Sequence, residues 1–82
     1  MMNRDELRTA LIEEITRIAP DLSAAEITDD ASLRDDYDLD SMDSFNLASA
    51  IHKRLGVNIP ETDFARLQSL AQLVAYLEKH PA

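Results

Sequence analysis

The chain has 82 residues, of which 16 are acidic and 8 basic, and its formal net charge is -8 at pH 7. This length suits a single domain, residues 1–82, with one core and no deep catalytic cleft. The charge argues against nucleic-acid binding through phosphates and favours partners with basic surfaces. The absence of cysteine excludes disulfides and a thiolate nucleophile. No apolar run approaches the about 20 residues that span a bilayer, so we expect a cytoplasmic protein without a membrane partner.

The composition and the first periodic segment favour an all-α fold. One glycine, three prolines and 45% hydrophobic residues give little material for tight hairpins. A first helix is expected from about Arg4 to Ile18, because Asn3 and Glu6 have the spacing of a capping box and Pro20 follows. Its apolar face comprises Leu7, Leu11, Ile15 and Ile18. Its charged residues lie mostly on the other faces: Glu6, Arg8, Glu13, Glu14 and Arg17.

A long connection, residues 20–40, follows the first helix. Loops of this length in a compact domain are usually functional or held down by apolar anchors. Ser23 and Glu26 are spaced to cap a short helical turn. The candidate anchors are Ile27, Leu33, Tyr37 and Leu39, and the acids expected outside are Asp29, Asp30, Asp35, Asp36 and Asp38.

An acidic stretch, residues 35–43, runs from this connection into a second helix, expected over residues 41–55. Its apolar residues recur at helical spacings: Phe45, Leu47, Ala48, Ile51 and Leu55. Asp40 is the natural N-cap, Asp43 places negative charge in the first turn, and Gly56 suits a left-handed C-cap. Ser41 is then the first helical residue, with an outward hydroxyl at the positive end of the helix, where a phosphate is favoured.

The last quarter of the chain predicts two further helices. Ile59-Pro60-Glu61 begins a short helix or turn, with Phe64 and Leu67 pointing inward. The final helix starts near Ser69, whose spacing to Gln72 is again a capping box. Its apolar stripe is Leu70, Leu73, Val74 and Leu77. Three longer helices and one short helix pool these faces into a small four-helix bundle.

Metal and enzyme chemistry fit the sequence poorly. An EF-hand with Asp36 at position 1 would place Ser41 where glycine is needed and Leu47 where a bidentate glutamate is needed. No dedicated metal site is therefore expected. A hydrolytic serine needs a base and a strained glycine-flanked turn, and Ser41 has neither. His52 and His80 are far apart and fit a solvated surface, so we expect no catalytic residue.

The pattern Asp40-Ser41-Met42-Asp43, opening a helix that ends before Gly56-Val57-Asn58-Ile59-Pro60, resembles the phosphopantetheine attachment region of acyl carrier proteins. The likeness covers nearly the whole chain. It implies that Ser41 is esterified with 4'-phosphopantetheine from coenzyme A, whose thiol holds cargo as a thioester. It also implies a carrier rather than an enzyme. Residues for partner recognition, by matching position, are Asp36, Asp40, Met42 and Asp43.

The resemblance also implies partners: a phosphopantetheinyl transferase, an acyl- or aminoacyl-loading ligase or transferase, and downstream synthases. The carrier is expected to be a monomer. Its cargo is open between fatty acyl, polyketide and aminoacyl groups. The alternative is an acidic helical adaptor that binds a basic protein, for which Ser41→Ala would leave function intact.

Two departures from the family pattern stand out. Tyr37-Asp38 replaces the usual Leu-Gly before the attachment pair, and aspartate is among the residues that tolerate left-handed geometry. The acidic face that related carriers often continue along the second helix is broken by Asn46 and by His52-Lys53-Arg54. We therefore expect a specialised carrier, read by its partners at the acidic end near Ser41, rather than the central carrier of fatty-acid synthesis.

Overall fold

The computed structural model describes residues 3–80, and these residues form helices and loops with no strand among them. The elements are α1 (Arg4–Ile18), the 3₁₀ turn η1 (Ala24–Glu26), α2 (Ser41–Leu55), α3 (Glu61–Phe64) and α4 (Leu70–Lys79). The expected all-α bundle of three longer helices and one short helix is confirmed. No helix in this part of the chain is long and apolar enough to cross a membrane.

The helix ends follow the capping signals in the sequence. Asn3 Oδ1 accepts from the amide of Glu6 at 2.9 Å, and Glu6 Oε1 accepts from the amide of Asn3 at 3.2 Å. Ser69 and Gln72 form the same reciprocal pair at the start of α4. Gly56 closes α2 with φ 74, a left-handed angle that costs glycine little. These pairs satisfy amides that have no partner inside the helix, which explains why the expected ends agree with the observed ones.

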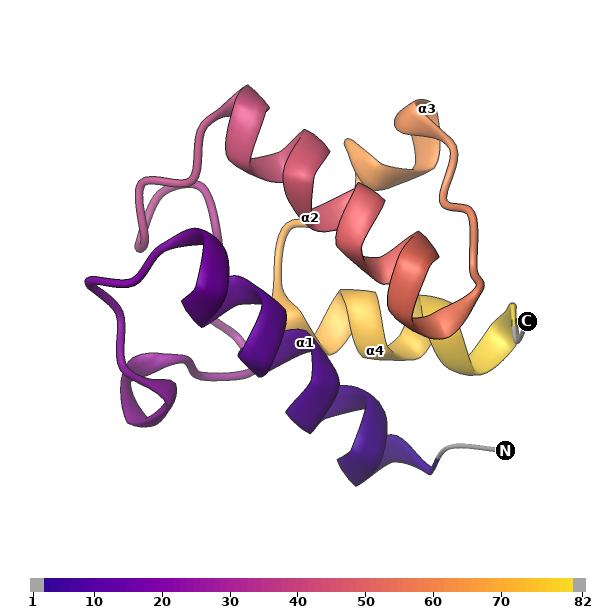
Figure 1. Ribbon diagram of the computed structural model, residues 1–82, viewed down its shortest axis with the longest axis horizontal. Helices are drawn as coiled ribbons and strands as arrows, with labels where there is room; N and C mark the ends of the chain where they lie inside the picture. The colour runs from indigo at the N-terminus through magenta and orange to yellow at the C-terminus, as the bar shows by residue number, and fades with distance from the viewer. Residues whose placement is uncertain (1–2, 81–82) are drawn as a thin grey trace.

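The core lies where α1, α2 and α4 meet. Figure 1 shows α1 and α2 side by side and running in opposite directions, and α1 also contacts α4. The most deeply buried side chains come from these three helices: Leu11, Ile15, Leu47, Ile51, Leu70, Leu73 and Val74. Phe64 and Leu67 are partly buried and pack against this core, as expected. Apolar area removed from water is the main stabilising term of such a bundle.

The long connection is held at three buried anchors, Ile27, Leu33 and Leu39, as expected. Tyr37 is half-buried, and its hydroxyl donates to the Glu26 carbonyl at 3.0 Å and accepts from the Thr28 amide at 2.9 Å. The acids of the connection are exposed, also as expected: Asp29, Asp30, Asp35, Asp36 and Asp38.

The same connection is fastened to the beginning of α4. The Leu33 amide donates to the Gln68 carbonyl at 2.8 Å, and the Ala71 amide donates to the Asp29 carbonyl at 3.0 Å. These bonds join backbone groups far apart in the sequence. They position the loop that leads into α2 relative to the C-terminal helix.

Two side chains differ from the sequence expectation. Phe45, grouped with the apolar residues of the second helix, is 70% exposed, because it lies two residues from Leu47 and so on nearly the opposite face. Glu14, grouped with the outward charges of the first helix, is buried. Its Oε2 accepts from Arg54 Nη1 at 2.8 Å, while Arg54 Nη2 also reaches Glu13. The hydrogen bonds that Arg54 donates to Glu14 and Glu13 raise the pKa of Arg54 above its ordinary value.

Candidate functional site

The acidic start of α2 is fixed by a reciprocal cap between Asp40 and Asp43. Asp40 has extended backbone angles, and its Oδ1 accepts from the Asp43 amide at 2.9 Å. Asp43 Oδ2 accepts from the Asp40 amide at 3.3 Å. The Asp40 carbonyl accepts from the Ser44 amide at 2.9 Å, which is the first bond of the helix. Asp40 is thus the N-cap, as predicted, and the position of the first helical turn is well defined.

Ser41 is the first residue of α2 and its side chain is exposed. Within residues 3–80 its hydroxyl has no hydrogen-bond partner, unlike the neighbouring carboxylates of the cap. The residue stands at the positive end of the helix dipole. An oxygen placed in this way is accessible to a second protein.

The backbone that leads into Ser41 turns through a left-handed residue. Asp38 has φ 55, and among residues 3–80 it is the one non-glycine residue with positive φ. Leu39, which follows, is buried, and its amide donates to the Leu33 carbonyl at 3.3 Å. Aspartate was expected only to tolerate this geometry, and the structure shows that Asp38 adopts it where the family usually has glycine. The turn at Asp38 brings Leu39 into the core, one residue before the exposed cap residue Asp40.

The four residues expected to meet partners occupy two places. Asp40, Met42 and Asp43 surround Ser41 in the first turn, where Asp40 and Met42 are exposed and Asp43 is half-buried. Asp36 lies earlier, on the exposed loop, where its Oδ2 accepts from the Ser32 amide at 2.7 Å. Its carboxylate therefore holds the loop as well as adding negative charge. The structure brings three of the four residues together, and their recognition role stays a prediction.

Phe45 is the residue of this surface that the sequence analysis missed. Met42 is 67% exposed and Phe45 is 70% exposed, and residues three apart adjoin on one helix face. The sequence spacing could have indicated that Phe45 is exposed. Leu47 and Ile51 lie on the buried face of the helix, and Phe45 is not on that face.

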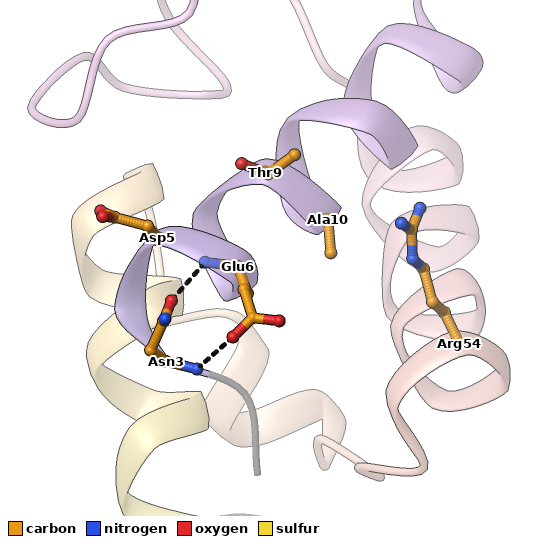
Figure 2. Close-up of a pocket in the computed structure, with 6 residues that line it drawn as sticks. All are labelled: Asn3, Asp5, Glu6, Thr9, Ala10 and Arg54. Atoms are coloured by element: carbon orange, nitrogen blue, oxygen red, sulfur yellow. Dashed lines mark hydrogen bonds between the residues drawn. The ribbon is translucent and has the colours of Figure 1, made fainter.

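A hollow of about 370 Å³ lies at the other end of the α1–α2 pair (Figure 2). It is lined by Asn3, Asp5, Glu6, Thr9, Ala10 and Arg54. Figure 2 shows five of these residues on or beside the first turns of α1 and Arg54 facing them from α2, with the Asn3–Glu6 capping bonds at the rim. At 1.5 Å per residue, Arg54 is about 20 Å along α2 from Ser41. The Thr9 hydroxyl lines the hollow with Asp5 and Glu6, but within residues 3–80 it makes no hydrogen bond to either carboxylate. Because the hollow also lies far from Ser41, it is not the candidate site.

Metal-ligating residues do not gather in the part of the chain that the structure describes, where no three His, Cys, Asp or Glu side chains come together. His52 and His80 are both exposed. The His80 ring packs against Tyr76 with ring centroids 4.3 Å apart. Neither histidine lies in the first turn of α2, so neither is placed to act on Ser41.

Comparison with known proteins gives a consistent result. A family model described as "Phosphopantetheine attachment site" matches residues 7–77. An acyl carrier protein of Rhodococcus erythropolis is 36% identical over 69 residues, covering 84% of this chain and 71% of that protein. The meromycolate extension acyl carrier protein of Mycobacterium tuberculosis is 39% identical over 69 residues. The match covers 84% of this chain but only 56% of that protein.

A third relative matches over almost its whole length. The acyl carrier protein of Brachyspira hyodysenteriae is 33% identical over 75 residues, covering 87% of this chain and 96% of that protein. The residues in the structure also suit the group that the family model names. The chain offers an exposed hydroxyl at a helix N-terminus, and it has no cysteine, so a thiol must come from an attached group. The chain therefore belongs to the phosphopantetheine-attachment family of acyl carrier proteins, and its cofactor is 4'-phosphopantetheine.

Proposed function

We propose that Ser41 carries the 4'-phosphopantetheine arm and that the protein passes acyl intermediates, as thioesters, between the enzymes of a specialised lipid pathway. In each step the protein acts as a cosubstrate of another enzyme. The observation that carries this proposal is the exposed Ser41 hydroxyl, held at the start of α2 by the Asp40–Asp43 cap.

Comparison of the chain's six serines supports the choice of Ser41. Four of them are half-buried: Ser32, Ser44, Ser49 and Ser69. Ser23 is exposed, but its hydroxyl donates to Glu26 Oε1 at 3.1 Å. Ser41 is exposed and, within residues 3–80, its hydroxyl is free of such a bond. Ser41 is therefore the one serine of the six that is both exposed and without a side-chain hydrogen bond within residues 3–80.

The transfer needs a base and a metal, and within residues 3–80 neither a histidine nor a metal-ligating cluster lies beside Ser41. Ser41 Oγ bonds to the pantetheine-side phosphorus of the coenzyme A pyrophosphate as the P–O bond to the nucleotide breaks. The nucleotide, adenosine 3',5'-bisphosphate, departs with the electron pair of that bond, and the hydroxyl proton passes to a base of the transferase. Asp40 already accepts from the Asp43 amide, and His52 is about 16 Å farther along the helix. Base and metal are therefore assigned to the transferase. Once attached, the group supplies the thiol that holds cargo as a thioester.

The electrostatics around Ser41 favour a solvated arm. The positive end of α2 stabilises a phosphate by about 0.3–1 kcal/mol. A carboxylate about 4 Å away in water opposes it by about 1 kcal/mol, and both Asp40 and Asp43 lie in this turn. The repulsion is at least as large as the attraction, so no net electrostatic attraction holds the phosphate against this turn, and the arm is held by its covalent bond and is free to swing toward a partner.

The recognition residues and the cargo follow from the same surface. We assign Asp36, Asp40, Met42 and Asp43 to contacts with the transferase, with a loading ligase or acyltransferase, and with downstream synthases. The relatives named for meromycolate extension support a lipid cargo over a polyketide or aminoacyl one.

Intact-mass measurement tests the proposal. The purified protein is incubated with coenzyme A, magnesium and a broad-specificity phosphopantetheinyl transferase, beside Ser41→Ala and the matched control Ser23→Ala. We expect wild type and Ser23→Ala to gain one phosphopantetheine and Ser41→Ala to gain none, with identical circular dichroism. A mass gain of one phosphopantetheine in Ser41→Ala would show that the arm is attached to another residue. No gain by folded wild type with several transferases would favour the acidic adaptor instead.

A further inference from the structure

The Tyr37 hydroxyl joins two separate parts of the long connection. It donates to the Glu26 carbonyl at 3.0 Å and accepts from the Thr28 amide at 2.9 Å, and we call these two hydrogen bonds the Tyr37 bridge. The two backbone groups flank Ile27, which is buried and directly follows η1. The Tyr37 ring is half-buried and packs against the core. The bridge therefore ties the segment that leads into Ser41 to one that lies nine to eleven residues earlier.

The segment 37–39 has few other hydrogen bonds. Within residues 3–80, the remaining one is donated by the Leu39 amide to the Leu33 carbonyl. Its length of 3.3 Å is above the usual range of about 2.7–3.2 Å, so it is a weak bond. The preceding turn, by contrast, is held by the Ser32 and Asp36 contacts. The Tyr37 bridge thus supplies most of the hydrogen bonding that holds the backbone between this turn and the cap of α2.

The left-handed residue Asp38 lies directly after the residue that makes this bridge. Its φ is 55, an angle that is less favourable for aspartate than for glycine. Such a conformation persists only where the surrounding structure holds it. The chain is held on both sides of Asp38, by the Tyr37 hydroxyl before it and by the buried Leu39 side chain after it. Loss of the hydroxyl would leave Asp38 held on one side only.

The conformation of Asp38 bears on Ser41 through the two residues between them. Leu39 is buried, and the next residue, Asp40, forms the reciprocal cap with Asp43. A change in the backbone angles of Asp38 redirects the chain, so it either withdraws Leu39 from the core or displaces Asp40 from the cap. In both cases the first turn of α2 loses a support. Ser41, the first residue of that turn, is then no longer held in one position.

We propose that Tyr37 is a positioning residue for attachment of the arm. Its hydroxyl holds Asp38 in the left-handed conformation and so keeps Ser41 where a phosphopantetheinyl transferase accepts it. Tyr37 does not touch the reacting atoms and acts through the backbone of residues 38–40. This inference rests on the proposed function, because it concerns attachment to Ser41. It goes beyond that function by giving a role to a tyrosine outside the acidic residues assigned to partner contacts.

Removal of the hydroxyl should change the population of the correct conformation rather than the chemistry of transfer. Without the bridge, a smaller fraction of the molecules presents Ser41 in its held position, and the apparent affinity of the transferase falls with that fraction. The KM for the carrier should therefore rise, while kcat stays at the wild-type value because every bound molecule is in the held conformation. A side chain needed only for global stability would change neither constant at a temperature where all variants are folded.

The chain's two tyrosines provide the variant and its matched control. Tyr37→Phe removes the bridge and keeps the ring, whereas Tyr76→Phe removes a hydroxyl that donates to Asp63 and does not contact the connection. Protein without the arm is incubated with coenzyme A, magnesium and a broad-specificity phosphopantetheinyl transferase, and initial rates are measured by intact mass over a range of carrier concentrations. Circular dichroism confirms that each variant is folded at the assay temperature. We expect kcat/KM to fall about two- to fivefold for Tyr37→Phe, through KM, and to stay unchanged for Tyr76→Phe.

Asp38→Gly tests whether the bridge acts through the left-handed turn. Glycine adopts this angle freely, so its turn should depend less on the bridge. Adding Tyr37→Phe to Asp38→Gly should therefore change kcat/KM by less than about 1.5-fold, whereas a hydroxyl that contacts the transferase directly would have the same effect in both backgrounds. Hydrogen exchange at the Leu39 amide, followed by NMR, should quicken about fivefold in Tyr37→Phe and not in Tyr76→Phe.

The proposal is overturned if Tyr37→Phe receives the arm with the wild-type kcat/KM, or if Tyr76→Phe loses as much. It is also overturned if the fall is equally large in the Asp38→Gly background, or if exchange at the Leu39 amide does not change. Failure of folded wild type to gain phosphopantetheine contradicts the proposed function. A normal gain by wild type, with Tyr37→Phe unchanged, contradicts only the positioning role.

Discussion

The two faces of α2 place hydrophobic side chains in opposite surroundings. Leu47 is 1% exposed and lies in the core against α1, whereas Phe45, two residues earlier, is 70% exposed. Both are apolar, and both recur at spacings typical of a helix. Their difference shows that an apolar residue of this helix can lie inside the fold or on its surface, and that apolar character alone does not decide which. The four predictions below test this division, beginning with the largest expected effect.

Replacing Leu47 or Phe45 with alanine should have very different effects on stability. Leu47→Ala should lower the free energy of unfolding by about 2–5 kcal/mol, because it removes buried contacts and leaves a cavity. Phe45→Ala should change it by less than about 0.5 kcal/mol, as for other exposed positions. Urea denaturation followed by circular dichroism measures both. Equal losses would mean that the Phe45 ring is buried in solution and that the division fails.

Asp40 is an exposed residue that should nevertheless contribute stability. Asp40→Ala should lower the free energy of unfolding by about 1 kcal/mol, since the Asp43 amide loses its acceptor. Asp40→Asn keeps an oxygen that accepts from that amide, so its free energy of unfolding should stay close to that of wild type. If the transferase recognises the Asp40 charge, phosphopantetheine should attach more slowly to Asp40→Asn. Asp35→Ala, an exposed acid of the preceding loop, is the control and should change neither measurement.

Substitutions at Asp38 test whether the backbone conformation of an exposed residue affects the free energy of unfolding. Asp38→Ala should lower the free energy of unfolding by about 1 kcal/mol, because alanine at φ 55 is more strained than aspartate. Asp38→Gly should be at least as stable as wild type, since glycine adopts this angle freely. The same urea titration compares the two variants. If Asp38→Ala were as stable as Asp38→Gly, the left-handed turn before Leu39 would not exist in solution.

Tyr76 is intermediate between the buried Leu47 and the exposed Phe45. Its ring is half-buried, and its hydroxyl donates to Asp63 Oδ2 at 2.9 Å. Burial, and then the hydrogen bond and charge of Asp63, raise the pKa of Tyr76 above its ordinary value of 10.0. The unfolded chain therefore loses this proton first as the pH rises. The stabilisation from Tyr76 is complete below pH 10 and declines as the pH climbs toward the higher pKa of the folded state.

Unfolding free energies measured from pH 8 to pH 11 test this expectation. Wild type should lose stability more steeply over the upper part of the range than Tyr76→Phe, which has no proton to release. Phe45→Ala should keep the wild-type slope, since it changes no ionisable group. Parallel curves for wild type and Tyr76→Phe would show that the Asp63 bond does not form.

The helix ends were predictable because the signals that set them are local. The capping pairs Asn3–Glu6, Asp40–Asp43 and Ser69–Gln72 each span three residues, and the structure contains all three. At Asp38 the sequence indicated only that the residue tolerates left-handed geometry, and the structure supplied the turn itself. Within the candidate site, the position of Ser41 at the head of α2 follows from the cap alone. Its assignment as the attachment residue came from the family resemblance.

The features that sequence reasoning missed depend on contacts between distant residues. From the sequence of α1 alone, Glu14 is predicted to be an exposed charge. It is buried because the packing of α2 against α1 brings Arg54 close enough to form an ion pair with it. The bonds that fasten the long connection to α4 join backbone amides and carbonyls, which carry no side-chain signal in the sequence. Phe45 differs, since the spacing alone placed it away from Leu47.

The fastening of the long connection to α4 has a consequence for synthesis of the protein. The Leu33–Gln68 and Asp29–Ala71 bonds draw on residues that leave the ribosome after Ser41 has already emerged. A nascent chain that ends before residue 68 cannot make them, so the loop leading into Ser41 lacks its final support. If Ser41 carries the arm as proposed, we expect attachment to be slower on chains that end before residue 68 than on complete chains, because the loop before the Asp40 cap is less firmly held.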